Sequence, residues 1–156
     1  MKKLILYFFS ISLSACSLTQ QAINIPKEVT LETPTKVRDG YIKLVPDAEY
    51  YVDSSSIWID NEDSNLVHFD AVINLLKGLY VYKPDTKRYA RSVRQYKILN
   101  CANYRLTQIR TDFYDNFWGE GLRAAPKNQP KHTVRLQPNS SLYTLGQIIC
   151  ANTKNK

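Results

Sequence analysis

The chain has 156 residues, and its 21 Lys and Arg outnumber its 14 Asp and Glu, which gives a net charge of +7. This length is enough for one domain with its own hydrophobic core. There are only 2 His and 3 Cys, and no GxSxG, HExxH or phosphate-binding glycine motif, so the sequence suggests neither a catalytic triad nor a cluster of metal ligands. We therefore expect a protein that is not an enzyme.

The first 15 residues (1–15) have the features of a secretory signal peptide. Two lysines precede LILYFFSISLSA, an apolar run that is shorter than the ~20 residues of a transmembrane helix. The run ends in LSAC, which resembles the lipobox of bacterial lipoproteins. Cleavage before Cys16 would make this cysteine the lipidated N-terminus, and several acyl chains such as palmitate give stable anchoring. An ordinary signal peptide with a bystander cysteine is the alternative. In lipoprotein sorting, an aspartate directly after the lipidated cysteine favours retention in the inner membrane. This chain has Ser17 at that position, so we expect lipid anchoring in the outer membrane.

Residues 16–38 are polar, contain two prolines and show no sustained periodicity. This composition is typical of a flexible tether between a lipid anchor and a folded domain. The expected domain then occupies residues 39–156.

Two cysteines remain in that domain if Cys16 carries lipid. Cys101 and Cys150 would lie in an oxidising compartment, and no CxxC spacing indicates a metal site. We expect a disulfide bond between them rather than two free thiols. Closing a loop of roughly fifty residues should stabilise the fold by about 4 kcal/mol in the chain-entropy model.

Runs rich in β-branched and aromatic residues predict strands in the first half of the domain. Residues 66–75 show the pattern most clearly, because Val67, Phe69, Ala71 and Ile73 alternate with more polar residues, as in a sheet covered on one face. Turn signals separate the runs at residues 46–47, 53–55, 60–64, 77–78 and 84–85. The predicted strands are 41–45, 49–53, 56–60, 66–75 and 78–83.

Residues 88–111 can be interpreted in two ways. Arg88, Arg91, Arg94 and Lys97 recur every three residues, which would align them along one side of a helix, whereas strands would divide them between two faces. The Tyr, Val, Ile and Thr content favours two adjacent strands, and this is our prediction. Residues 112–131, rich in glycine and proline, are expected to form a long loop before a last strand in 131–137.

Residues 139–152 are predicted to form a short amphipathic helix. Asn139 or Ser140 can cap it, and Leu142, Leu145 and Ile149 lie at i, i+3 and i+7. A helix of three turns is marginal alone, so it needs the sheet and the disulfide to hold it. The expected fold is mainly β (α+β): a single antiparallel sheet with a C-terminal α-helix packed on it and tied by the disulfide.

Positive charge concentrates between Lys83 and Arg110, where eight basic residues accompany one acid. Localised charge creates a directed field, so this basic segment is a candidate docking surface for acidic partners such as glycosaminoglycans, host matrix proteins or anionic surfaces. A solvated sheet edge is the alternative. Nucleic acid is excluded as a partner by the expected export. The eight residues are Lys83, Lys87, Arg88, Arg91, Arg94, Lys97, Arg105 and Arg110.

Other polar residues are expected to have structural roles. We interpret His68 as a structural strand histidine and His132 as a solvated loop residue. Asp112 and Asp115 could pair as acid and base, but turn and capping roles are expected instead. The 11 tyrosines indicate sheet packing or a contact surface.

The stretch GLYVYKPDTKRYARSVRQYKILNCANYRLTQIRTDFYDNFWGEGLRAAPK resembles the core of the surface-adhesin protein E family, outer-membrane lipoproteins of Gram-negative respiratory bacteria. The likeness covers about residues 40–152. It implies about six antiparallel strands, a C-terminal helix tied by one disulfide, and an ability to form homodimers. It also implies a cell-surface adhesin that contributes to virulence by binding vitronectin, laminin, plasminogen and epithelial cells. A haem-binding or haem-storage lipoprotein is the alternative; no other cofactor and no metal are expected.

The resemblance also places the binding segments on this chain. The vitronectin segment carries over onto Lys83–Arg110, that is, onto the eight basic residues. Plasminogen binding would use Lys154 and Lys156, because a terminal lysine offers an ammonium and a carboxylate together. The laminin segment carries over onto Tyr41–Phe69, with Tyr41, Lys43, Tyr50, Tyr51, Trp58, His68 and Phe69 as candidates.

Overall fold

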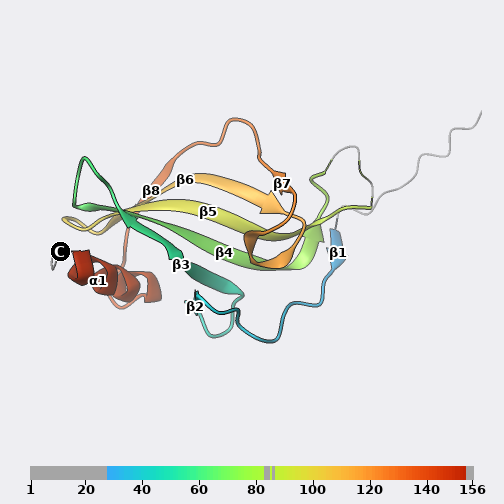
Figure 1. The fold of residues 1–156 in the computed structure, drawn as a ribbon, viewed down its shortest axis with the longest axis horizontal. Coiled ribbons are helices and arrows are strands. Elements are labelled where there is room, and N and C mark those ends of the chain that lie inside the picture. The colour runs from blue at the N-terminus through green and yellow to red at the C-terminus, as the bar shows by residue number, and fades with distance from the viewer. Residues whose placement is uncertain (1–27, 83–84, 86, 154–156) are drawn as a thin grey trace, which may run out of the picture.

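In a computed structural model of the chain, the structure describes residues 28–82, 85 and 87–153, which form one antiparallel sheet and one α-helix (Figure 1). A short 3-10 helix, η1, spans Phe117–Gly119, and the α-helix, α1, spans Ser141–Thr153. The strands are β1 (Glu28–Thr30), β2 (Tyr41–Lys43), β3 (Tyr50–Ile59), β4 (Leu66–Leu79), β5 (Ala90–Asn100), β6 (Arg105–Tyr114), β7 (Arg123–Ala124) and β8 (His132–Arg135).

The strand order is β2-β3-β4-β5-β6-β7, with β1 also paired to β4 and β8 to β6. With its 14 residues, β4 is long enough to pair with β3 and then with β1 along one edge, while β5 follows its other edge. The predicted fold class is confirmed. The described residues form eight strands instead of about six, because short strands extend both edges of the central sheet.

Two of the predicted turns are wrong, because residues 53–55 lie inside β3 and residues 77–78 inside β4. The register of β3 shifts between Asp53 and Trp58, which marks a bulge. There the Asp53 carboxylate accepts hydrogen bonds from the backbone and hydroxyl of Ser55, and Ser56 Oγ accepts one from the Asp70 amide. These side chains satisfy polar groups at the bulge, so the strand continues where the sequence signals a turn.

The predicted tether is too long at its C-terminal end. Glu28–Thr30 forms β1 and pairs with Lys77–Leu79 of β4. A Cβ atom added to Gly78 would lie 2.9 Å from Val29 Cγ2, so glycine is what allows β1 to approach. The folded domain therefore includes residues from Glu28 onward, and Cys16 lies outside the described residues.

The two adjacent strands predicted in 88–111 are confirmed as β5 and β6, with a bulge between Tyr96 and Lys97. The predicted loop 112–131 begins too early, because β6 continues to Tyr114 and β7 pairs with its end. The last predicted strand, in 131–137, corresponds to β8, which pairs with β6.

The predicted helix and disulfide are both present. Ser140 caps α1, since its Oγ accepts a hydrogen bond from the Tyr143 amide. Leu145 and Ile149 are buried in the core beside Leu99 of β5, and Cys101 bonds to Cys150. Figure 1 shows α1 against one end of the sheet, with β1 at the opposite end. Within the described part of the chain, no helix has the length and apolar character to cross a membrane.

Candidate functional site

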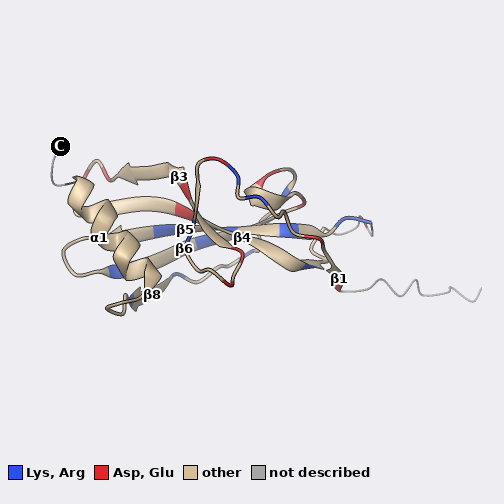
Figure 2. Cartoon of the chain, turned by 90° about the horizontal axis from the view of Figure 1, so that it is seen from below, with Lys and Arg blue, Asp and Glu red and all other residues tan. Residues whose placement is uncertain are grey.

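The basic segment does not form a single exposed surface. Its residues are spread along the approach to β5, along β5 and along β6, and Figure 2 shows the basic positions distributed over the sheet. Because side chains alternate along a strand, the three-residue spacing divides them between two faces. Lys83 lies outside the described residues. Lys97 is buried, Arg88 and Arg94 are partly buried, and the exposed members are Lys87, Arg91, Arg105 and Arg110.

Arg94 lies in a partly buried ion-pair network. Its Nη1 donates to Asp70 Oδ2 at 2.8 Å and to Asp53 Oδ2 at 3.0 Å. Its Nη2 reaches the Tyr41 hydroxyl at 3.2 Å. A Cβ on Gly119 would meet Arg94 Nε at 2.7 Å, and the positive φ of +69° at this position also favours glycine. One side chain thus joins β2, β3, β4 and β5, so Arg94 is a structural residue.

The two carboxylates respond differently to Arg94. Burial raises the pKa of Asp70, and the hydrogen bonds from Arg94 only partly oppose it. Burial also acts on Asp53, but hydrogen bonds from Ser55 and Arg94 outweigh it and hold the pKa of that carboxyl below its usual value. For Arg94, burial alone would lower the pKa, and its hydrogen bonds to the two carboxylates raise it instead. The guanidinium therefore stays charged.

Lys97 is the buried member of the basic segment among the described residues. Only 7% of its surface is exposed, and Nζ donates to Gln108 Oε1 at 3.2 Å. No carboxylate pairs with this ammonium among the described residues. Burial lowers the pKa of Lys97 to about 8. This charge opposes folding and is hidden from a docking protein.

Replacing Lys97 by methionine is expected to raise the free energy of unfolding at pH 7 by about 1–3 kcal/mol, since it removes a buried charge. The pKa of the amine is below its usual value in the folded state, so the unfolded state binds more protons between about pH 8 and pH 10. Wild-type stability should therefore rise relative to the variant over this range. Urea unfolding at pH 7, 8.5 and 10 measures the difference, with Lys127→Met as the exposed control. A difference independent of pH would contradict the burial argument.

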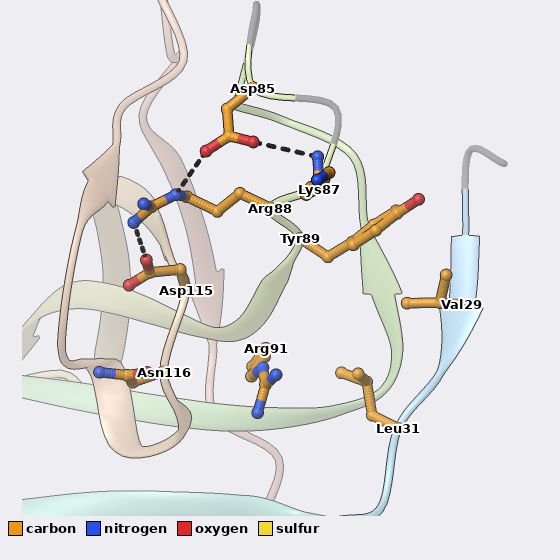
Figure 3. A pocket seen from close by; sticks show the side chains of 9 residues that line it. All are labelled: Val29, Leu31, Asp85, Lys87, Arg88, Tyr89, Arg91, Asp115 and Asn116. Carbon is orange, nitrogen blue, oxygen red and sulfur yellow. Dashed lines mark hydrogen bonds and ion pairs between the residues drawn. The ribbon is translucent and has the colours of Figure 1, made fainter. Parts of the chain in front are cut away.

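A pocket of about 420 Å³ lies at the N-terminal end of β5, where Lys87, Arg88 and Arg91 contribute to its wall. Figure 3 shows Arg88 between Asp85 and Asp115, with Val29 and Leu31 on another side. The remaining lining residues are Tyr89 and Asn116. This basic pocket brings together the start of the basic segment and β1, which the sequence places in the tether.

The two acids of the basic pocket are already occupied. Asp85 accepts the Lys87 amide at 3.0 Å and Arg88 Nε at 3.1 Å. Asp115 accepts Arg88 Nη1 and the Leu122 amide, which confirms a loop role for this aspartate. Within the described part of the chain, Lys87 and Arg91 form no ion pair. Positive charge therefore remains available at the pocket.

Arg110 and Arg123 share one carboxylate, an arrangement that was not predicted from the sequence. The Nε atoms of Arg110 and Arg123 lie 3.1 and 2.7 Å from Asp112 Oδ2, and that carboxylate is fully buried. Asp112 therefore does not have the turn or capping role that we expected: it lies inside β6 and neutralises arginines. Arg123 has no recognisable signal in the sequence, since β7 is two residues long and lies in a glycine- and proline-rich stretch.

The laminin candidates lie around the β2–β3 edge. Tyr51 and Phe69 are almost completely buried, and burial raises the pKa of Tyr51 to about 12 with help from its hydrogen bond to Glu49. Lys43 pairs with Glu49, and Tyr50 packs against the core. Trp58 is 51% exposed and, with Ile42 and Ile148, lines an apolar groove beside α1.

The histidine predictions have different outcomes. His68 is structural, as expected: Nε2 lies 2.9 Å from Asp60 Oδ2, and the ring stacks on Trp58 with centroids 3.8 Å apart. Its Nε2 could bind a haem iron only by giving up Asp60. His132 is exposed, as expected, but lies in β8 instead of a loop. Among the described residues, no cluster of three or more His, Cys, Asp or Glu is placed to hold a metal. Lys154 and Lys156 lie outside them.

Comparison with known proteins gives a consistent answer. Two Haemophilus influenzae proteins named surface-adhesin protein E, from strains KW20 / Rd and NTHi 3655, are 63% and 62% identical over 152 residues, which cover 97% of this chain and 94% of each relative. The crystal structure of protein E from non-typeable Haemophilus influenzae matches with a TM-score of 0.76 and 66% identity, covering 83% of this chain and 88% of that one. A second structure of Haemophilus influenzae protein E matches with a TM-score of 0.75 and 65% identity, covering 84% and 98%. The family model of surface-adhesin protein E matches residues 41–151, and the chain belongs to this family.

Proposed function

We propose that this chain is a non-enzymatic adhesin at the cell surface that binds host matrix and serum proteins and epithelial cells. The adhesin role is supported by the names of its relatives. The observation that carries the proposed contact is that three exposed cations of the basic segment form no ion pair among the described residues: Lys87, Arg91 and Arg105. Unpaired surface charge steers the approach of an acidic partner.

Vitronectin is the ligand that we assign to these cations, together with the Arg110–Arg123 pair. Arg94 is removed from the contact set because it is paired with Asp53 and Asp70, and Lys97 because it is buried. We assign laminin to the Tyr41–Phe69 segment, whose exposed part includes Trp58, and plasminogen to Lys154 and Lys156. Outer-membrane anchoring through a lipidated Cys16 is supported by the lipobox-like LSAC sequence.

Replacing Lys87 and Arg91 by alanine together is expected to raise the Kd for immobilised vitronectin about tenfold, since two exposed charge contacts of about 0.7 kcal/mol each add up to this factor. Binding should be measured at about 0.05, 0.15 and 0.5 M salt, because screening acts over roughly 8 Å at physiological ionic strength and shortens as salt is added. The salt dependence of the variant should be weaker than that of the wild type.

A matched control is available, because Lys127 and Lys131 are also exposed and lie outside the basic segment. The Lys127→Ala, Lys131→Ala variant loses the same net charge and should bind vitronectin like the wild type. Laminin binding should be unchanged in both variants. Equal losses of vitronectin affinity in the two double variants would show that only net charge matters. Unchanged vitronectin binding in the Lys87→Ala, Arg91→Ala variant would show that the basic segment is only a solvated surface.

A further inference from the structure

We propose that the basic pocket at the start of β5 binds an anionic group on an aromatic stem, as a sulfated or phosphorylated tyrosine side chain presents it. This inference rests on the proposed adhesin function, because it names the chemical group of a host protein that the pocket would hold. The pocket measures about 420 Å³, within the ~300–1,000 Å³ that small-ligand sites occupy.

The charges of the pocket favour an anion. Arg88 is bound by Asp85 and Asp115, and the four oxygens of these two carboxylates all accept hydrogen bonds. Their negative charge is therefore directed at Arg88 and at backbone amides. Lys87 and Arg91 line the same pocket and form no ion pair among the described residues.

Arg91 is oriented without being neutralised. Its guanidinium carbon lies 5.9 Å from the centroid of the Phe117 ring, a cation–π contact that leaves the charge in place. Guanidinium groups bind sulfate and phosphate oxygens with paired N–H donors, and the Lys87 ammonium adds a point charge. Lys87 and Arg91 thus both contribute positive charge to the wall of the pocket.

The apolar part of the pocket favours an aromatic stem over a bare ion or a sugar. Val29 and Leu31 come from β1 and the residue after it, and Tyr89 packs against Tyr80 with ring centroids 6.1 Å apart. Figure 3 shows the Tyr89 ring on the side of the pocket that faces Val29. Aliphatic and aromatic walls gain free energy from an apolar ring, whereas inorganic sulfate and highly hydroxylated sugars do not use them.

The test titrates three small probes into the chain without its predicted signal peptide. Binding is detected by NMR signals of the Val29 and Leu31 methyl groups and the Tyr89 ring. We expect 4-methylphenyl sulfate to bind about tenfold more tightly than inorganic sulfate at equal ionic strength, and 4-methylphenol to bind at least about tenfold more weakly than the aryl sulfate. Equal affinities of aryl sulfate and inorganic sulfate would overturn the proposal, as would shifts that map outside the pocket.

Two variants separate the charged wall from the apolar one. Arg91→Gln should weaken aryl sulfate and inorganic sulfate alike, by about fivefold. Val29→Ser, which keeps the backbone pairing of β1, should weaken only the aryl sulfate. Arg105→Gln is the matched control, because Arg105 is an exposed arginine of the basic segment outside the pocket, and it should change neither affinity. Unchanged amide spectra of β4 and β6 verify the fold. If Val29→Ser has no effect, the aromatic stem is excluded.

Sucrose octasulfate provides the competing outcome. If it binds more tightly than the aryl sulfate and independently of Val29, the pocket serves sulfated glycans and the proposal fails. Vitronectin binding is measured separately on the same variants. If the chain binds vitronectin but not the aryl sulfate, this inference alone is overturned. If it binds the aryl sulfate but no host protein, the proposed adhesin function is overturned.

Discussion

Replacing Arg94 by alanine is expected to lower the free energy of unfolding by about 3–5 kcal/mol, the largest loss for any single residue of the basic segment. Asp53 and Asp70 are directly opposite each other on β3 and β4, and Arg94 contacts both. Their side chains are 12% and 19% exposed. Without the guanidinium, these two partly buried carboxylates would repel each other, and little water could reach them to weaken the repulsion.

Chemical denaturation at pH 7 measures this loss. The Asp53→Asn, Asp70→Asn, Arg94→Met variant is the informative control, because it removes the three charges together and should recover most of the stability. Lowering the pH should also narrow the gap between Arg94→Ala and wild type, since protonation relieves the repulsion. A loss below about 1 kcal/mol in Arg94→Ala would show that the network contributes no more than an exposed pair.

Replacing Cys101 and Cys150 by serine is expected to lower the free energy of unfolding by about 4 kcal/mol in the chain-entropy model. The bond closes a loop with a sequence separation of 49 and joins the end of β5 to the last turn of α1. The helix has 13 residues and is therefore marginal without tertiary contacts. The apolar contacts of Leu145 and Ile149 remain in the variant.

Hydrogen exchange locates the effect of the missing bond. Amide protection in α1 should fall before protection in β4 and β5, because the sheet keeps its own hydrogen bonds and most of its core. Wild type in the oxidised state is the reference, and reduction of wild type should reproduce the double-serine result. Equal protection of α1 in all three samples would show that packing alone holds the helix.

Periodicity and composition in the sequence determined the class of fold. The alternation in 66–75, the β-rich composition of 88–111 and the apolar stripe of 139–152 identify β4, the β5–β6 pair and α1, because each depends on local spacing. Cysteine count and the expected export were sufficient for the Cys101–Cys150 bond. Family membership also followed from the residues themselves, since the resemblance covers most of the domain.

The strand and tether boundaries that were predicted wrongly are those that depend on contacts with residues distant in the sequence. Residues 53–55 have the composition of a turn, yet the Asp53 carboxylate accepts the Ser55 amide, the Ser56 hydroxyl donates to the Asp53 carbonyl, and β3 continues. The tether contains β1 because β4 has a free edge beyond β3, and Gly78 leaves room for Val29. Local composition cannot report which edge of a sheet is left unpaired.

Only the tertiary structure decided which basic residues are available for binding. The sequence gives Arg91 and Arg94 the same weight, but one lies exposed at a pocket and the other is enclosed by Asp53 and Asp70, 41 and 24 residues away in the chain. Arg123 joins Arg110 through a buried carboxylate that the sequence presents as part of a loop. Burial and ion-pair partners decide whether a charged side chain is structural or available for binding. The pairing of strands sets both the burial and the partners.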